Sequence, residues 1–128
     1  MTKFLVFMLL AAAQQANAAD AFSDRISKAR KVERSPEAQP VLMDFMNETR
    51  YSSQNAMGKC FKDGEPPSYT LVADLLADGT ISNVEIQPTT PALECYRQEF
   101  QKITFETSIP ARYRKDGIPI FIKTTWKH

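Results

Sequence analysis

Residues 68–87 decide the fold, and their sequence is SYTLVADLLADGTISNVEIQ. Two apolar-rich runs of strand length meet at Asp78-Gly79, a dipeptide that readily adopts the positive φ of a tight turn. The stretch therefore predicts one β-hairpin. Cys60 and Cys95 flank it, each in a segment whose apolar residues recur at helical spacing.

Each strand of this hairpin has a predicted inner face. In the first strand the even-numbered face carries Asp74, so the core face is the odd-numbered one, which consists of Tyr69, Leu71, Ala73 and Leu75. In the second strand Val84 and Ile86 share parity, whereas Ile81 does not. A β-bulge after the Asp78-Gly79 turn would absorb this shift, which leaves the register near Ser82 open.

The first eighteen residues have the pattern of a secretory signal peptide. Lys3 supplies the positive start, residues 4–13 are an uninterrupted apolar run, and Ala16-Asn17-Ala18 offers small residues for cleavage. The alternative is a membrane anchor, but a spanning helix needs roughly 20 apolar residues. We therefore expect residues 1–18 to be removed and the protein to be periplasmic, with no transmembrane segment after cleavage.

Charge and cysteine content narrow the classes of function. The chain has 16 Lys and Arg against 15 Asp and Glu, and loss of Lys3 with the signal peptide would balance them. No global charge then favours nucleic acid or a membrane surface. An oxidising compartment favours a disulfide between Cys60 and Cys95. A redox or metal site is the alternative, but there is no Cys-x-x-Cys spacing and no nearby histidine.

The segment 19–39 precedes the main domain, which is expected to span residues 40–128. Phe22, Ile26 and Ala29 predict a short helix in this segment, and five Lys and Arg residues make it basic. It is either a solvated helix or a contact arm for an acidic partner. From Pro40 to Cys60 the spacing predicts one long helix with a single inward-facing stripe, which consists of Leu42, Phe45, Met46, Thr49, Ser53, Ala56, Met57 and Cys60. The middle of this stripe is polar, which predicts either a shallow groove or loose packing around Thr49 to Ser53.

After the hairpin, Thr89-Thr90-Pro91 predicts a capped helix start, and Cys95 lies on the buried face of that helix. Residues 118–126 alternate as a third strand, with Pro119 tolerable at an edge or a strand end. The fold class is α+β, with the order helix, two strands, helix, strand. We expect a three-stranded antiparallel sheet with two helices on one face.

These elements resemble the C-terminal domain of TonB and its small exported relatives. The resemblance rests on the hairpin sequence from Asp78 to Ile86, Pro91 at a helix start, Phe105 and Pro110 before the last strand, and the Gly117-Ile118-Pro119-Ile120 strand opening. It covers about residues 40–126 and implies a role in the cell envelope, connected with transport. TonB itself has a membrane-anchored N-terminus and a long proline-rich spacer, so its energy transduction is not implied.

The resemblance implies that the last strand lies at a sheet edge and pairs with an extended segment of an envelope partner. The expected contact residues are Ile120, Phe121, Ile122, Thr124 and Trp126. The edge could instead pair with a second copy of the chain or with nothing. Another alternative is an immunity or inhibitor protein that neutralises a toxin in the periplasm.

A third alternative is a binder of an anionic envelope polymer or lipid. It would use a basic patch near the end of the second helix, formed by Arg97, Lys102, Arg112, Arg114 and Lys115. An enzyme is not expected, because no nucleophile with a base and no catalytic spacing of carboxylates is present. We also expect no cofactor. The cysteine spacing and the lack of a nearby histidine predict no metal site, and the balanced charge predicts no nucleic-acid partner.

Overall fold

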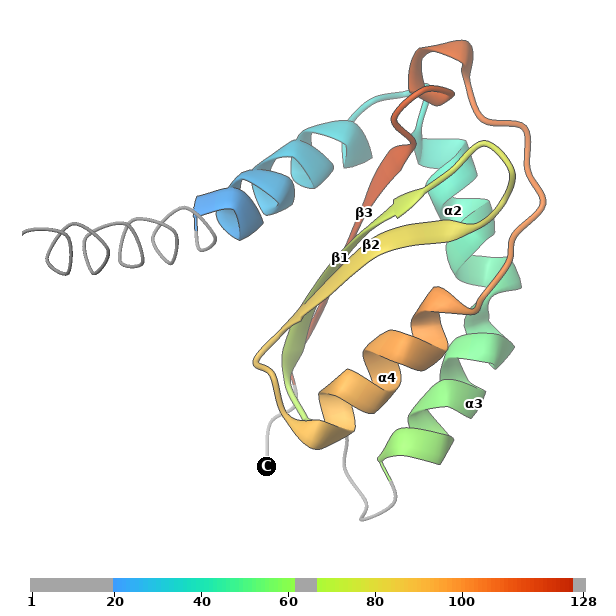
Figure 1. Ribbon diagram of the computed structural model, residues 1–128. Helices are drawn as coiled ribbons and strands as arrows, with labels where there is room; N and C mark the ends of the chain where they lie inside the picture. The colour runs from blue at the N-terminus through green and yellow to red at the C-terminus, as the bar shows by residue number, and fades with distance from the viewer. Residues whose placement is uncertain (1–19, 62–66, 126–128) are drawn as a thin grey trace, which may run out of the picture.

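The computed structural model describes residues 20–61 and 67–125, and it shows an α+β fold around a three-stranded antiparallel sheet in the order β2-β1-β3 (Figure 1). Residues 20–33 are helical. The elements that follow are α2 (Gln39–Glu48), α3 (Arg50–Cys60), β1 (Tyr69–Leu75), β2 (Ile81–Gln87), α4 (Pro91–Gln101), a 3-10 helix (Ala111–Tyr113) and β3 (Ile118–Thr124). The fold class predicted from the sequence is confirmed. The predicted signal peptide, residues 1–18, lies outside the described residues.

The hairpin turns at Asp78-Gly79, as predicted. Gly79 has φ +86°, and a Cβ there would meet the Phe105 carbonyl oxygen at 2.5 Å. The Asp78 carboxylate accepts hydrogen bonds from the Thr80 hydroxyl at 2.6 Å and from the Thr80 N–H at 3.0 Å. These bonds lower the pKa of Asp78, the bond from the hydroxyl having the largest effect. The turn therefore has both the backbone freedom and the side-chain cap that it requires.

A bulge in β2 explains how apolar residues at odd and even positions can face the same side of the sheet. The pairing shifts between Val72↔Glu85 and Asp74↔Ser82, and Asn83 has φ +53°. The extra residue lets three side chains of β2 point into the core, namely Ile81, Val84 and Ile86, which are all buried. The predicted core face of β1 is also confirmed, because Tyr69, Leu71, Ala73 and Leu75 are at most 3% exposed.

The long helix predicted from Pro40 to Cys60 is two helices, which meet at Thr49. Thr49 leaves helical geometry at φ −92° and ψ 2°, and it is buried. Its hydroxyl donates to the Phe45 carbonyl oxygen at 2.6 Å, which is a local bond that competes with regular helix geometry. The polar middle of the stripe is therefore the point where α2 ends and α3 begins.

α4 closes the core over β2, next to α3. The Thr90 side chain caps it by accepting from the Leu93 N–H at 3.1 Å, and Pro91 stands in the first turn, as predicted. A disulfide joins Cys60 at the end of α3 to Cys95 in α4, with the Cα atoms 5.6 Å apart. The pairing of the two cysteines is thus confirmed.

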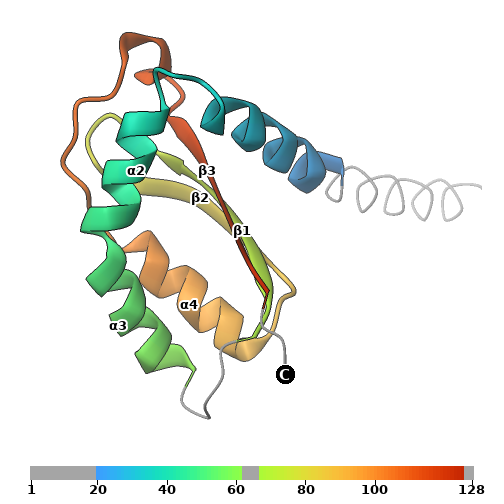
Figure 2. The same cartoon turned by 180° about the vertical axis from the view of Figure 1, so that it is seen from behind.

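The helix formed by residues 20–33 lies on the face of the sheet opposite α2, α3 and α4, as both views show (Figures 1 and 2). Phe22 and Ala29 are buried, and the Arg25 guanidinium lies 2.6 Å from Glu85 and 3.6 Å from Asp74. The Arg30 guanidinium stacks over the Phe121 ring at 5.3 Å. Two of the basic residues of this segment, Arg25 and Arg30, therefore attach it to the sheet.

Tyr96 should make folding stability sensitive to alkaline pH. It is fully buried, and its hydroxyl is 2.9 Å from that of Ser53. Burial raises the pKa of its phenol far above the usual value of about 10. Above that pH the unfolded chain loses a proton that the folded chain keeps, so stability is full below pH about 10 and falls as pH rises.

The expected fall is up to about 1.4 kcal/mol per pH unit from this one group. It can be measured by urea unfolding at several pH values between about 9 and 11. Tyr96→Phe has no proton to lose and should show a flatter profile. Equal slopes for the two proteins would show that Tyr96 is not responsible.

Candidate functional site

The outer edge of β3 is the first part of the candidate site. Because β1 is the central strand, β3 pairs on one side only within the described residues. Four of the predicted contact residues lie in this strand, namely Ile120, Phe121, Ile122 and Thr124. The fifth, Trp126, lies outside the described residues. An unpaired edge of this kind offers backbone donors and acceptors to another strand.

Pro119 indicates which backbone groups of β3 face outward. Proline has no N–H, so it is tolerated in a sheet where its nitrogen points away from the neighbouring strand. Along a strand, the backbone N–H and C=O groups of successive residues point alternately to the two sides. We therefore infer that the N–H groups of Phe121 and Lys123 also face the open edge. Ile118, Ile120 and Ile122 then pair inward with Leu75, Ala73 and Leu71.

An apolar cavity of about 320 Å³ lies beside this edge, between α2 and β3. Its apolar lining comes from Leu42, Met43, Phe45, Met46, Ile120 and Phe121, and Glu33, Gln39 and Asn47 complete it. Met43 and Met46 are 66% and 51% exposed, which is unusual for two large apolar side chains on one helix face. The cavity therefore presents an apolar surface to solvent next to unpaired backbone.

A second cavity, of about 270 Å³, continues the first along β3. The two share Phe45 and Met46, and the second also contacts Thr49, Ser53, Met57 and Ile122, with Arg50 and Gln54 at its rim. Together they form what we call the β3 groove. The shallow groove predicted around Thr49 to Ser53 is the lower part of it.

The sequence had indicated Met46 as part of a buried stripe, and it gave no sign of Met43. Both lie on the exposed face that α2 turns toward the edge of the sheet. Their position depends on where α2 ends and on how it sits across β3, which residue spacing alone does not fix. The predicted burial of Met46 is therefore wrong, and Met43, a large apolar residue outside the predicted stripe, was the available signal.

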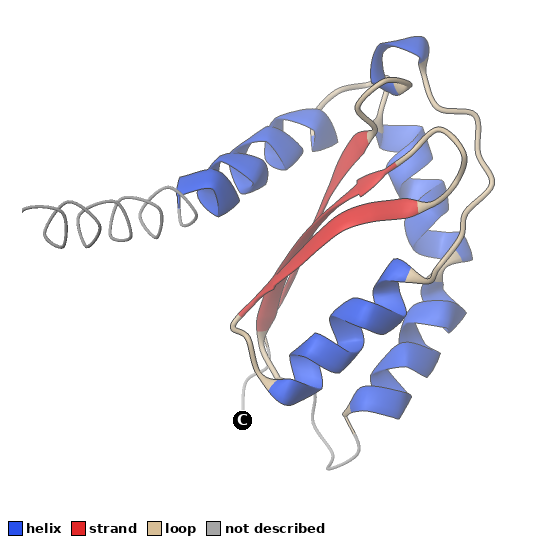
Figure 3. Ribbon diagram, in the orientation of Figure 1, coloured by secondary structure: helices blue, strands red, loops and turns tan. Residues whose placement is uncertain are grey.

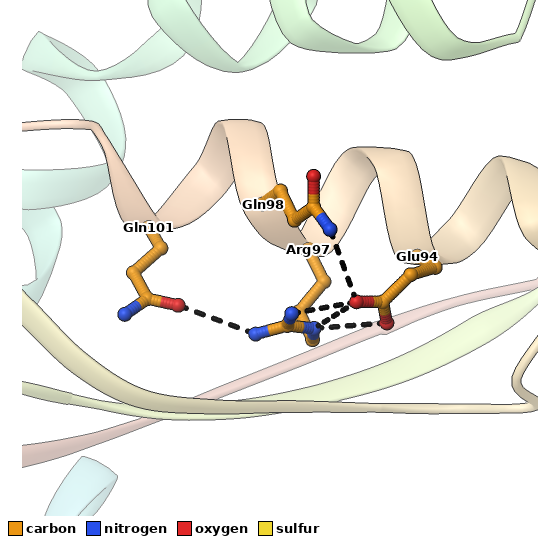
Figure 4. Close-up of polar contacts among 4 residues, drawn as sticks. All are labelled: Glu94, Arg97, Gln98 and Gln101. Carbon is orange, nitrogen blue, oxygen red and sulfur yellow. Dashed lines mark hydrogen bonds and ion pairs between the residues drawn. The ribbon is translucent and has the colours of Figure 1, made fainter.

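The predicted basic patch does not form. The Arg97 guanidinium is bound to Glu94 at 2.6 Å and donates to the Gln101 side chain, on the surface of α4 (Figure 4). Hydrogen bonds from Arg97 lower the pKa of Glu94. Lys102 is likewise paired, with Glu99 at 3.1 Å. Both cations therefore belong to short-range pairs along one helix.

The other three predicted basic residues lie elsewhere. Residues 103–110 carry the chain from α4 to the 3-10 helix at the upper end of the sheet in Figure 3. Arg112 lies there, over the Tyr113 ring and 3.9 Å from Glu37, while Arg114 donates to the Ile109 carbonyl oxygen. Lys115 is exposed in the turn that follows. The extended segment separates the two groups, which sequence proximity had suggested would be together.

The described residues contain neither a candidate metal centre nor a helix that could span a membrane. Within residues 20–61 and 67–125, no three His, Cys, Asp or Glu side chains are grouped so that they could hold a metal ion. In the same part of the chain, every helix is too short or too polar to span a bilayer.

Comparison with known proteins gives no match. No family model, no curated protein and no solved structure is significantly similar to the chain. The resemblance to the TonB C-terminal domain therefore stays a prediction from the sequence. What the site can do has to be argued from its own geometry.

Proposed function

We propose that the protein is a non-enzymatic binding module of the periplasm, which binds an extended segment of an envelope protein along the edge of β3. The observation that carries the proposal is the coincidence of an unpaired strand edge with the exposed methionines of the β3 groove. Either feature alone is common on protein surfaces. Side by side, they match the two requirements of strand addition, which are backbone pairing and pockets for alternate side chains.

The spacing of the groove suggests how a partner strand is held. Ile120 and Ile122 are two residues apart on one face of β3, and each lines a different cavity of the groove. In a strand paired with β3, side chains at i and i+2 would lie opposite them on the same face. The partner should therefore place apolar side chains at two alternate positions, where flexible methionines can adapt to their shape.

Export supports the envelope as the location of the partner. The first eighteen residues have a signal-peptide pattern. A disulfide in a chain of this size suits an oxidising compartment. The resemblance to the TonB C-terminal domain agrees with this location and with a non-enzymatic role.

A photo-reactive amino acid at Met46 tests the proposal in the periplasm. It should capture a protein whose crosslinked peptide contains apolar residues at alternate positions. The same residue at Tyr51, which is 78% exposed and outside the groove, should not capture that protein. A product of twice the mass of the chain would instead indicate a second copy, and the proposal of an envelope partner would then be abandoned.

Backbone pairing can be separated from side-chain contact at Lys123. Lys123→Pro removes an N–H that we infer faces the open edge, whereas Lys123→Ala keeps it. We expect the proline variant to lose at least about tenfold in affinity for the captured segment, and the alanine variant to bind like the wild type. Titration of a fluorescent peptide of that segment would measure both, and equal affinities would show that β3 does not pair with it.

A charge in the groove should also prevent binding. Met46→Glu places a carboxylate among apolar side chains, where it cannot be solvated once a partner strand covers it. Because Met46 is half exposed in the free protein, the unfolding free energy should change little. Tyr51→Glu is the matched control, and it should bind normally; if it binds as weakly as Met46→Glu, added charge alone explains the loss.

A further inference from the structure

A third cavity, of about 320 Å³, lies between the N-terminal helix and the segment of residues 112–119. Its lining shares no residue with the β3 groove. Three cationic side chains line it, which are Lys28 and Lys31 from the N-terminal helix and Arg112 from the 3-10 helix. Its lining contains one carboxylate, that of Asp116. We call it the basic cavity.

The two lysines are placed at an electrostatic cost. Residues three apart lie on the same face of a helix, so Lys28 and Lys31 repel each other. Within residues 20–61 and 67–125, neither has an acidic partner within the 4.0 Å of an ion pair. Arg112 has only a weak, exposed pair with Glu37 at 3.9 Å. Three cations therefore face the cavity with little compensation from the protein.

The rest of the lining is apolar. Val32 comes from the helix, Tyr113 is almost fully buried, and Pro119, near the start of β3, is buried as well. The volume falls within the range of small-molecule sites, about 300 to 1,000 Å³, and it exceeds what a bare inorganic anion would fill. A ligand that complements both the cationic and the apolar part of the lining has an anionic group and a small organic part.

We propose that the basic cavity binds a phosphate ester. A phosphate group can accept hydrogen bonds from both ammonium groups and from the planar guanidinium of Arg112 at once. Its organic part then packs against Val32, Tyr113 and Pro119. The ester is either the headgroup of an anionic phospholipid or a small free molecule, and the two share this chemistry.

Binding at this site joins two parts of the chain that are far apart in sequence. One side of the cavity belongs to the helix of residues 20–33, and the other belongs to residues 112–119. A ligand that bridges them holds the N-terminal helix on the sheet. It should therefore raise the thermal stability of the protein, by an amount that grows with the logarithm of the ligand concentration once that concentration exceeds Kd.

The test uses glycerol 3-phosphate as the free ester, measured by calorimetric titration, and phosphatidylcholine vesicles with and without phosphatidylglycerol, measured by co-sedimentation. We expect binding in at least one arm, and the arm that responds identifies the source of the phosphate. Lys28→Gln combined with Lys31→Gln should weaken that binding at least about tenfold. Added salt should weaken it as well.

Lys102→Gln is the matched control, since it removes the same kind of charge from an exposed lysine on α4, outside the cavity. It should bind like the wild type. Circular dichroism would verify that the double variant folds, and Arg112→Gln gives an independent variant if it does not. The proposal is overturned if neither probe binds the wild type, or if Lys102→Gln weakens binding as much as the cavity variants do.

Discussion

Replacing Phe45 with alanine is expected to lower the free energy of unfolding by about 3 to 5 kcal/mol. Phe45 is 1% exposed, and its ring makes edge-to-face contacts with Phe100 at 6.4 Å and with Phe105 at 5.5 Å. It therefore joins α2 to α4 and to the extended segment after α4. The truncation removes buried apolar surface and both ring contacts, and the sheet cannot move to fill the space.

Urea unfolding measured by circular dichroism would give the size of this effect. Met43→Ala on the same helix is the matched control, because Met43 is 66% exposed and should cost well under 1 kcal/mol. A domain of this size has a total stability of about 5 to 15 kcal/mol, so the Phe45 variant should lose a substantial part of it. Similar losses for the two variants would mean that α2 does not depend on Phe45 for its attachment.

Removal of the disulfide is the second change with a large expected effect. Cys60 and Cys95 are 35 residues apart in sequence, and in the chain-entropy model a loop of that length is worth about 3 to 4 kcal/mol. The double variant Cys60→Ser and Cys95→Ser should lose about this much, because its unfolded chain is no longer constrained. Its urea midpoint should fall accordingly.

Reduction of the wild-type protein provides the control. If the effect is that of a crosslink, reduced wild type and the double serine variant should unfold at nearly the same urea concentration. The β3 groove contains neither cysteine, so the folded fraction of either form should still bind a groove ligand. Loss of binding without loss of folding would instead point to a functional thiol site.

Much of the fold could be predicted because its signals are local. The turn at Asp78-Gly79, the bulge in β2 and the cap at Thr90 each depend on residues within a few positions of one another. The break at Thr49 was missed because continuous helical spacing hides it. Only the buried position of that side chain shows why its hydroxyl bonds to the helix backbone.

The placement of the N-terminal helix could not be predicted, since it depends on long-range contacts. Arg25 meets Glu85 sixty residues away, and Arg30 lies over Phe121. The predicted basic patch failed for a related reason. Its members are close in sequence but separated by an extended segment, while Lys28 and Arg112, which do line one cavity, are distant in sequence.

The strand edge and the groove were predicted to different degrees. An edge position for the last strand followed from Pro119 and from the resemblance. The exposed methionines depend on the angle at which α2 crosses the sheet. Phe45 holds α2 in the core through its contacts with Phe100 and Phe105, so the placement of this helix is a property of packing rather than of local sequence.

The bulge in β2 has a consequence for how the protein can assemble. The sheet has two edges, and they are unequal: β2 has a kinked backbone at Asn83 and the charged Glu85, whereas β3 is regular beyond Pro119. Bulges and charges are features that discourage further pairing at an edge. Addition of a strand is therefore favoured at β3 over β2, and growth of the sheet from both sides into a polymer is disfavoured.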